Sequence, residues 1–517
     1  MLVYGDRSET VDPLRRLETI AKAAERLRVM PPGIDRHSAL VSVLIDTGQL
    51  LQGLADLGSA EADQVNTYLY DLARCVIRSC DSGHSEMGAL PSVPLLLELP
   101  SLVELRVPEG FAFYALYPEA YVEAARRLAL TRPPFVIGIR SIGTTLGAIV
   151  AAALNAGPPV TVRPHGDPYA RQVQLPEALP TDRHFVIVDE GPGMSGSSFG
   201  SVADALEARR VPRERIAFVP SHSGELGPEA SEAHRRRWQA AQRPAAEFDS
   251  RWLGARFESL REFDTAGISA RRKYLAEKGG QTLLVKFAGL GRLGAQKLEM
   301  ARKFATAGLS PEPVGLMHGF LVERWHGEAR PLGESEKPLA EIGHYIGTRA
   351  RLFPAEDNSG ASLEQLLEMA RRNVAIALGS AASDRIPDVP QVSMKRVRTD
   401  NKLDRREWLR LPDGRLLKSD ALDHHQAHDL TGCQDAAWDV AGAICEFGLN
   451  EREADAVVAA TGCHIDRQLL DFYRVPYAAF RLGQAVLGEQ PAERYAAELE
   501  RLLLHGHGGI PPKSAIG

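Results

Sequence analysis

The chain has 517 residues but only five cysteines, no apolar run long enough to span a membrane and no excess of basic residues. Five cysteines are too few for a disulfide framework, and their spacings match no pair of zinc ligands. Residues 135–153 come nearest to a membrane span, but they include Arg140 and several Gly and Thr. The first residues lack the basic-then-apolar pattern of a signal peptide. We therefore expect a cytoplasmic protein without a membrane segment.

Acidic residues slightly outnumber basic ones: 67 Asp and Glu stand against 61 Lys and Arg, a net charge of −6. This balance argues against a nucleic-acid partner, and the basic runs at 208–210 and 235–237 have acidic neighbours, as solvated helix faces do. The 44% of hydrophobic and 25% of charged residues are typical of globular proteins. Small molecules are the expected partners, and homo-oligomerisation is left open.

The length allows three or four domains of ~150 residues, and the apolar pattern divides the chain into three regions. Residues 1–100 are expected to form a helical N-terminal region. Apolar residues recur there at three- and four-residue spacing in three stretches, 14–29, 36–57 and 60–80. No motif in this region indicates chemistry. Three polar residues are expected on helix surfaces rather than in a cleft: His37, Asp46 and Asp56.

Residues 101–250 alternate short apolar runs with helical patterns. The predicted strands are 135–139, 160–162, 184–189 and 216–219. This alternation predicts a doubly wound parallel sheet, in which ligands bind beyond the C-terminal ends of the strands. Residues 251–517 begin with a predicted hairpin around Gly279 and Gly280 and continue mainly as helix, which predicts an α+β domain. The predicted fold is therefore multi-domain α/β.

The most informative segment of the middle region is 186–198. It places Asp189 and Glu190 directly after an apolar strand and follows them with a loop of Gly and Ser that opens a helix. Small residues let backbone N–H groups approach a phosphate, and the helix N-terminus adds favourable partial charge. The two carboxylates suit the hydroxyls of a ribose or a pyrophosphate bridged by Mg²⁺.

This segment resembles the ribose-phosphate-binding motif of type I phosphoribosyltransferases. The upstream turn 138–145 resembles the pyrophosphate loop of that family, and residues 163–171 stand where its mobile catalytic loop would be. The resemblance implies phosphoribosyl pyrophosphate and Mg²⁺ as ligands. It implies catalytic roles for Asp189, Glu190, Arg163 and Arg171. It implies ligand-binding roles for Arg140, Ser141, Gly193, Met194, Ser195, Gly196, Ser197 and Ser198.

The loop after Glu190 departs from the family pattern, because it is about one residue longer than usual and contains Pro192. The competing interpretation is a glycine-rich strand-to-helix turn in a sheet without catalytic activity. The resemblance does not identify the acceptor of the phosphoribosyl group.

A second set of residues with chemical potential lies in the C-terminal region. Lys286 is on a predicted strand, and Glu299, on the helix behind it, is expected to pair with it. A strand at 320–324 enters a hinge with Gly327. Further on, Asp400 and Asp420 flank a predicted hairpin through residues 412–414, and a helix with the pattern Gly-x-x-Asp-x-x-x-Asp follows at 432–439.

This order resembles the aminoglycoside-phosphotransferase-like kinase fold, which implies a bilobal domain that binds ATP and Mg²⁺. By position, Lys286 and Glu299 would hold the nucleotide phosphates. Residues 323–325, from Glu323 to Trp325, would face the adenine. Asp400 would orient the accepting hydroxyl and Asp420 would bind the metal. Asp435 and Asp439 would brace the catalytic loop.

Two departures from the kinase pattern stand out. The His-Gly-Asp of the family is Arg398-Thr399-Asp400, and Arg405 replaces the expected metal-binding Asn. Asp404, Glu407 or a residue of 423–429 would then be the second metal ligand. The three His and two Asp of that last run also allow a zinc site.

Together the two resemblances predict a bifunctional transferase. It would transfer phosphoribose between phosphoribosyl pyrophosphate and an unidentified acceptor, and a phosphoryl group from ATP to a small-molecule hydroxyl. Two alternatives are a non-catalytic sensor of phosphorylated ribose or nucleotides with a degenerate kinase-like module, and a defence protein acting on nucleotide pools.

Overall fold

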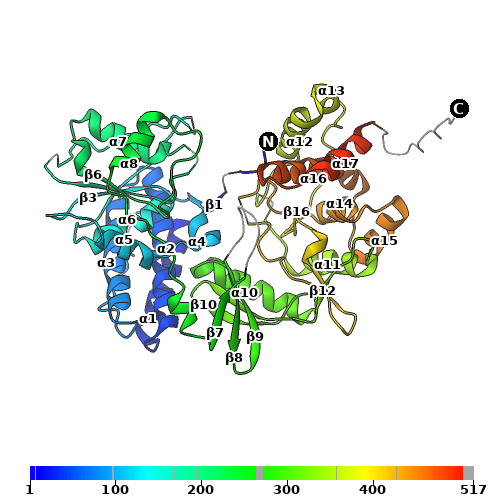
Figure 1. The fold of residues 1–517 in the computed structure, drawn as a ribbon, viewed down its shortest axis with the longest axis horizontal. Coiled ribbons are helices and arrows are strands. Elements are labelled where there is room, and N and C mark those ends of the chain that lie inside the picture. Colours follow the sequence, from blue (N-terminus) through cyan, green and yellow to red (C-terminus); the bar gives the residue numbers. More distant parts are fainter. Residues whose placement is uncertain are drawn as a thin grey trace.

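The computed structural model describes residues 1–504, apart from Asp6, 96–97, Pro168, Thr181, Met194, 264–271, Asp357 and Ala427. Met194, one of the residues expected to bind phosphate, thus lies outside the described residues. The two halves of the chain lie side by side, with the parallel sheet and its helices in one half and a larger, mainly helical body in the other (Figure 1).

A four-stranded parallel sheet organises the first half. Its strands are β3 (Phe135–Ile139), β4 (Val160–Val162), β5 (Phe185–Val188) and β6 (Ile216–Val219), in the order β4-β3-β5-β6. Helix α6 (Ile142–Ala153) connects β3 to β4, and α7 (Ser197–Ala208) connects β5 to β6. The predicted doubly wound sheet is therefore present, and its order reverses between β3 and β5.

Side chains of β5 alternate between two hydrophobic clusters, as the two-residue period of a strand requires. Val186 and Val188 pack toward the cluster that contains the N-terminal helices, while Phe185 and Ile187 pack toward α7. The helices on the first face are α1 (Pro13–Val29), α2 (Ile34–Asp56), α3 (Ala62–Asp81), α5 (Pro118–Arg126) and α6. On the second face lie α7 and α8 (Glu232–Ala240), whose Trp238 is buried against Phe199 and Phe218.

Helix α2 is the one described helix that is long and apolar enough to cross a membrane. In the fold it is a core helix, since 72% of its most apolar window is buried against neighbouring helices.

The second half begins with a five-stranded antiparallel sheet in the order β10-β11-β9-β8-β7. Its strands are β7 (Ser259–Glu262), β8 (Lys273–Lys278), β9 (Gln281–Phe287), β10 (Pro313–Met317) and β11 (Phe320–Arg324), with α10 (Gly291–Thr306) between β9 and β10. Small two- and three-stranded sheets follow, made of β12 (Arg330–Pro331), β13 (Arg396–Val397), β14 (Trp408–Arg410), β15 (Leu416–Lys418) and β16 (Gln434–Asp435).

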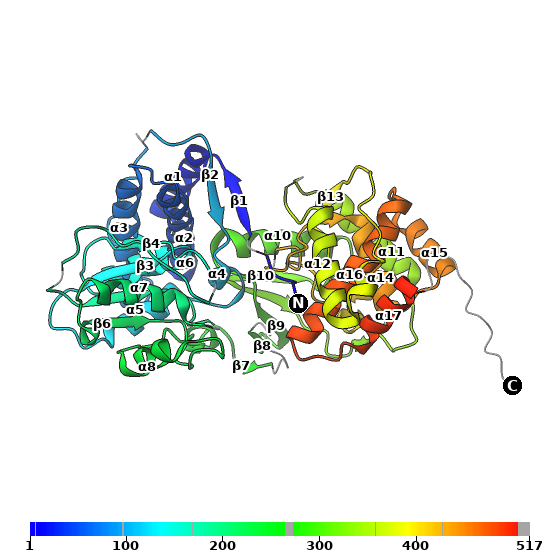
Figure 2. The ribbon, with the colours of Figure 1, turned by 90° about the horizontal axis from the view of Figure 1, so that it is seen from above.

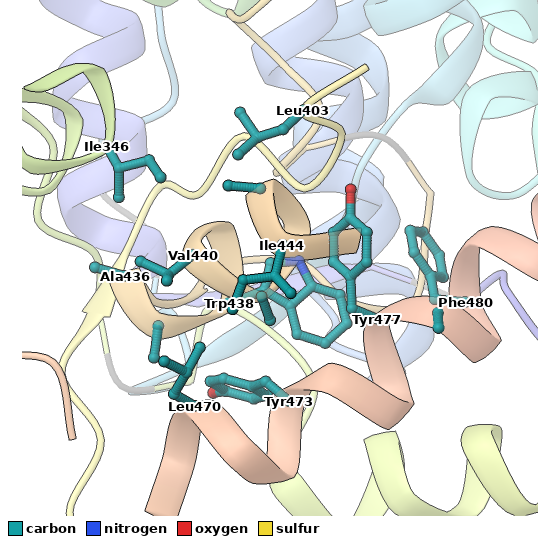
Figure 3. Close-up of a cluster of buried hydrophobic side chains, with 14 of the residues drawn as sticks. Ile346, Leu403, Ala436, Trp438, Val440, Ile444, Leu470, Tyr473, Tyr477 and Phe480 are labelled. Carbon is teal, nitrogen blue, oxygen red and sulfur yellow. The ribbon is translucent and has the colours of Figure 1, made fainter. Parts of the chain in front are cut away.

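The helical body contains α11 (Leu339–Leu352), α12 (Leu363–Leu378), α13 (Ser380–Ser383), α14 (Ala436–Phe447), α15 (Glu451–Thr461), α16 (Arg467–Leu487) and α17 (Glu493–Leu504). Trp438 of α14 is fully buried at its centre and stacks edge-on against Tyr473 of α16 (Figure 3). Tyr477 and Phe480 of α16 close the same cluster. This core fixes α14, whose first turn carries Asp439.

One hydrophobic cluster crosses from the first half into the five-stranded sheet. Leu283, Val285 and Phe287 of β9 belong to the same cluster as the helices of the first half. The opposite face of β9 carries Lys286 and looks toward the helical body. The sheet therefore has one apolar face against the first half and an opposite face that carries Lys286.

The N-terminal segment also connects the halves (Figure 2). Val3 is buried in the helical body, and the Leu2 N–H donates to Asn373 of α12 (2.7 Å). A few residues later, β1 (Ser8–Val11) pairs with β2 (Val103–Arg106) in the first half. The mixed α/β, multi-sheet architecture confirms the coarse fold expectation. The domain boundaries at 100 and 250 stay predictions, because one core spans both.

The crossing of α2 over α6 predicts a sensitive position at Gly48. A Cβ there would lie 1.9 Å from Oγ1 and 3.3 Å from Cα of Thr145. Gly48→Ala should push α2 off α6 and lower the free energy of unfolding by about 1–3 kcal/mol, measured by urea denaturation. Gly315→Ala, where a Cβ meets no atom within 4 Å, is the control. Equal stability of both variants would refute the tight crossing.

Candidate active sites

The first candidate site lies where the order of the parallel sheet reverses. Arg140 and Ser141 follow β3, and Asp189 follows β5, so these residues meet at the same edge. Arg163 follows the neighbouring strand β4. In open α/β sheets the crevice at this switch point is the usual ligand site. The structure thus brings together the residues that the sequence placed at three separate strand ends.

Asp189 lies against the first turn of α6. A Cβ on Gly143 would be only 3.3 Å from its Oδ1, so glycine is what allows the carboxylate to approach the helix. Burial raises the pKa of Asp189 well above its usual value, and the charges of Arg163 and Arg171 partly oppose this. The Tyr121 hydroxyl donates to the backbone carbonyl of Asp189 (3.0 Å) and holds the strand end.

Glu190 has different surroundings from Asp189. Its carboxylate accepts from the Gly110 N–H in the short helix α4 (Glu109–Phe113). Burial, followed by the nearby Glu109 charge, raises the pKa of Glu190 to about 7. Glu109 in turn accepts from Nδ1 of His428 (2.9 Å), which belongs to the C-terminal half. The two carboxylates therefore have different neighbours, and Glu190 faces the junction between the halves.

Two of the predicted arginines are held by Asp56 at the end of α2. Asp56 Oδ1 accepts from Arg140 Nη1 and from Arg163 Nε, both at 3.0 Å. Arg163 also donates to the Arg140 carbonyl (2.9 Å). Sequence reasoning placed Asp56 on a helix surface, and the structure shows instead that it orients the arginines. Arg171 is exposed, near enough to Asp189 to lower the pKa of that residue.

The loop before α7 turns through three glycines with positive φ: Gly191 (+105°), Gly193 (+68°) and Gly196 (+62°). Side chains are disfavoured at such angles, which explains the small residues of the motif. Ser195 Oγ accepts from the Ser197 N–H (3.2 Å) at the start of α7, and Ser198 follows in the first turn. The loop thus presents a helix N-terminus of the kind that binds phosphate.

The second candidate site lies on the face of the five-stranded sheet that carries Lys286. Lys286 Nζ is 2.9 Å from Glu323 Oε2 and donates to the Ser419 carbonyl (3.1 Å). The expected pairing of Lys286 with Glu299 is wrong, because Glu299 is exposed and pairs with Lys303 (3.5 Å). Glu323 is thus engaged by Lys286 rather than turned toward an adenine.

Two further residues of this face complete its description. Trp325 lies beyond the end of β11, where it lines a groove over β8 and β9. On α10 the buried lysine is Lys297, whose Nζ is 2.8 Å from Asp423. Nothing in the sequence distinguished Lys297 from Lys303, the other lysine of that helix, so the prediction missed it.

The Asp400 side chain is completely buried, and both of its carboxylate oxygens have polar partners. Its carboxylate accepts from the Tyr345 hydroxyl (2.6 Å) and His424 Nδ1 (2.8 Å), and lies 3.2 Å from Lys418 Nζ. Burial opposes its ionisation, but Lys418 and His424 outweigh burial and hold the pKa of Asp400 well below its usual range. Its backbone N–H donates to Asp439 Oδ2 (2.9 Å).

Asp439 braces the loop that carries Asp400, as the sequence suggested. Besides the Asp400 N–H, it accepts the Asn401 N–H at Oδ1 (3.0 Å). Burial and the Asp400 charge raise the pKa of Asp439 to about 6. Asp435 accepts from the N–H groups of Ala437 and Lys395, both 3.0 Å away. It thus connects the first turn of α14 to the residue before β13.

Asp420, Asp423 and His424 offer ligand atoms that all lie within 4.8 Å of one another. Carboxylate oxygens are what Mg²⁺ prefers, so this group fits the metal of a phosphotransferase. Lys273 lies 3.7 Å from Asp420 on the sheet side. Asp404 does not join this group, because Arg406 binds it at 2.7 Å.

The three histidines of 423–429 do not converge on one point, although His424 and Asp423 share a group of metal-binding atoms with Asp420. His424 binds Asp400, and His428 binds Glu109. His425 is buried, and its ring nitrogens have no hydrogen-bond partner among the described residues.

No family profile and no curated protein matches the chain. Among solved structures, about half of the chain is similar to choline kinase LicA from Streptococcus pneumoniae, with 49% of this chain and 95% of that one aligned at 14% identity and a TM-score of 0.36. A macrolide 2'-phosphotransferase type I aligns over 49% and 94%, at 14% identity and a TM-score of 0.33.

A thermostable mutant of aminoglycoside phosphotransferase APH(4)-Ia aligns over 50% of this chain and 100% of its own, at 14% identity and a TM-score of 0.34. TM-scores of this size do not establish an activity. The comparisons lend no support to phosphoribosyl transfer, which stays a prediction.

The raised pKa of Glu190 predicts a pH-dependent stability. The folded protein keeps this proton up to about pH 7, whereas the unfolded chain loses it near the usual value of 4.5. Stability from this group therefore falls as pH rises between these values. Glu190→Gln removes the effect. The melting temperature of the variant minus that of the wild type should therefore increase by several degrees from pH 5 to pH 8. Glu123→Gln, exposed on α5, is the control, and a pH-independent difference would contradict the prediction.

Proposed function

We propose that the C-terminal half transfers a phosphoryl group from ATP to a hydroxyl of a small molecule. The observation that carries this is the braced, ionised Asp400 beside the cation-binding group of Asp420, Asp423 and His424. Phosphoryl transfer needs positioning and charge neutralisation more than covalent chemistry, and these residues supply both. Lys286, between Glu323 and the carbonyl next to Asp420, is placed to meet the nucleotide phosphates.

Asp400 would orient the accepting hydroxyl. Its low pKa keeps it ionised and makes it a weak base. It would therefore accept a hydrogen bond from the hydroxyl without removing the proton early, which suits a loose transition state. Of its three side-chain partners, His424 is the most accessible. We infer that the hydroxyl takes the place of His424 at Oδ1. Asp420 and Asp423 would hold Mg²⁺, which would supply positive charge next to the transferring phosphate.

Asp400→Asn should lower phosphoryl transfer by about 10²- to 10⁴-fold with little change in the affinity for Mg·ATP. Asp420→Asn should instead weaken Mg·ATP binding. The measurements are ADP release with a panel of nucleosides, amino sugars and amino alcohols, and calorimetric titration of ATP with Mg²⁺. Asp413→Asn, exposed in the hairpin turn, is the control. Full turnover by Asp400→Asn would exclude this mechanism.

We also propose that the parallel sheet binds phosphoribosyl pyrophosphate with Mg²⁺ and transfers its phosphoribosyl group. The supporting observation is that Asp189, the two Asp56-bound arginines and the loop before α7 meet at the switch point. The N–H groups of residues 193–198 would bind the ribose phosphate, Asp189 would accept ribose hydroxyls, and Arg140, Arg163 and Arg171 would neutralise the pyrophosphate.

Binding requires an exchange of partners at this site, because Asp56 already neutralises Arg140 and Arg163. The pyrophosphate would replace Asp56 as the partner of the two arginines. Until then, Asp56 keeps their positive charges next to the site. The sensor alternative uses the same contacts without turnover, and the absence or presence of pyrophosphate release separates the two.

Asp189→Asn and Arg163→Ala should each weaken the binding of Mg²⁺ and phosphoribosyl pyrophosphate at least about tenfold, because each removes a charge-assisted contact. Calorimetric titration measures the affinity, and pyrophosphate release with a panel of nucleobases measures turnover. Asp182→Asn, on the surface, is the matched control. Unchanged affinity in both variants would remove the ligand from this site. Tight binding without pyrophosphate release would favour the sensor.

A further inference from the structure

Five side chains with metal-binding atoms gather where the helices of the first half meet the five-stranded sheet. They are His37 of α2, Cys80 of α3, His84 just after α3, Glu119 of α5 and His318 in the turn between β10 and β11. None of them belongs to either candidate active site. His37 was expected on a helix surface, but only 1% of it is exposed.

The carboxylate of Glu119 is at the centre of this cluster. Its Oε1 lies 2.6 Å from His37 Nε2 and 2.8 Å from His318 Nε2. The ligand atoms of His37, Cys80 and Glu119 all lie within 4.8 Å of one another, and His318 stands outside this group of three but reaches it through its contact with Glu119. The ring of His84 packs on His37 with centroids 4.5 Å apart, outside this inner group.

One carboxylate oxygen of the cluster, Glu119 Oε2, is buried and has no hydrogen-bond partner among the described residues. His318 is only 5% exposed. Folded proteins rarely leave buried polar atoms unpaired, and a bound ion can satisfy those that no protein group reaches. Nδ1 of His37 lies 2.9 Å from Ser79 Oγ, which can accept its proton and leave the Nε2 lone pair for a metal.

We infer that this cluster is a structural zinc site, with His37 Nε2, Cys80 Sγ, the Glu119 carboxylate and His318 Nε2 as ligands. Imidazole, thiolate and carboxylate in a group of four are the donors that zinc takes in tetrahedral sites. On binding, the ion replaces the two hydrogen bonds to Glu119, both imidazoles bind as neutral rings, and the Cys80 thiol releases its proton.

The site would fasten the two halves together. Three ligands come from the helices that cover the parallel sheet, and His318 comes from the hairpin of the other sheet. All four zinc positions are taken by protein atoms, so the ion would have a structural rather than a catalytic role. The hairpin lies beside the aromatic rings of Tyr117 and Trp252, which exclude water from this side.

The test is the metal content of the full chain, purified without chelator and without a histidine tag. We expect about one zinc per chain, and replacement by Co²⁺ should give tetrahedral d–d bands and a thiolate charge-transfer band. Cys80→Ser should abolish the charge-transfer band, and His318→Ala should lower the zinc content severalfold. Cys463→Ser and His344→Ala, outside the cluster, should change neither.

His424→Ala separates this site from the phosphotransferase metal group and should keep the zinc. Circular dichroism checks that the variants fold, and an anomalous difference map at the zinc edge locates the ion without any variant. Zinc-free protein that does not take up Zn²⁺ at micromolar concentration would overturn the inference. So would a cobalt spectrum that Cys80→Ser leaves unchanged, or an anomalous peak elsewhere.

Discussion

The apolar contact between the helices of the first half and the five-stranded sheet determines where both candidate sites lie. One face of β9 is buried in this contact through Leu283, Val285 and Phe287, so Lys286 must point to the other face. Tyr117 seals the contact: its ring packs on Phe287, and its hydroxyl donates to the His318 carbonyl (2.7 Å). Tyr117, which belongs to neither candidate site, thus stabilises the contact that fixes the face on which phosphoryl transfer is proposed.

The same contact places the two sites within electrostatic reach of each other. His428 belongs to the segment after Asp420, yet it binds Glu109, which stands next to Glu190. The hydrogen bond to Glu109 is the main cause that raises the pKa of His428, and the negative charge of Glu190 adds to it. The charge of His428 in turn opposes the rise in the pKa of Glu190 that burial causes. Such effects are reciprocal, so a ligand that changes the ionisation of one group changes that of the other.

The sequence revealed those parts of the structure that have a local signature. The alternation of strands and helices predicted the parallel sheet, and glycines with their small neighbours predicted the turn before α7. The sequence did not reveal partners that come from distant segments. Asp56 reaches Arg163 across more than 100 residues, and Glu323 is chosen over Glu299 because of strand register, which no local pattern encodes.

That register determines which carboxylate reaches Lys286 in the C-terminal half. Leu321 of β11 stands opposite Lys286, so Glu323, two residues on, is its diagonal neighbour on the same face of the sheet. A lysine paired to a helix would be released whenever that helix moved. Here both partners belong to one sheet, and α10 packs against α2 of the first half. The position of Lys286 therefore rests on the pairing of β9 with β11 and on the Ser419 carbonyl rather than on a carboxylate of α10.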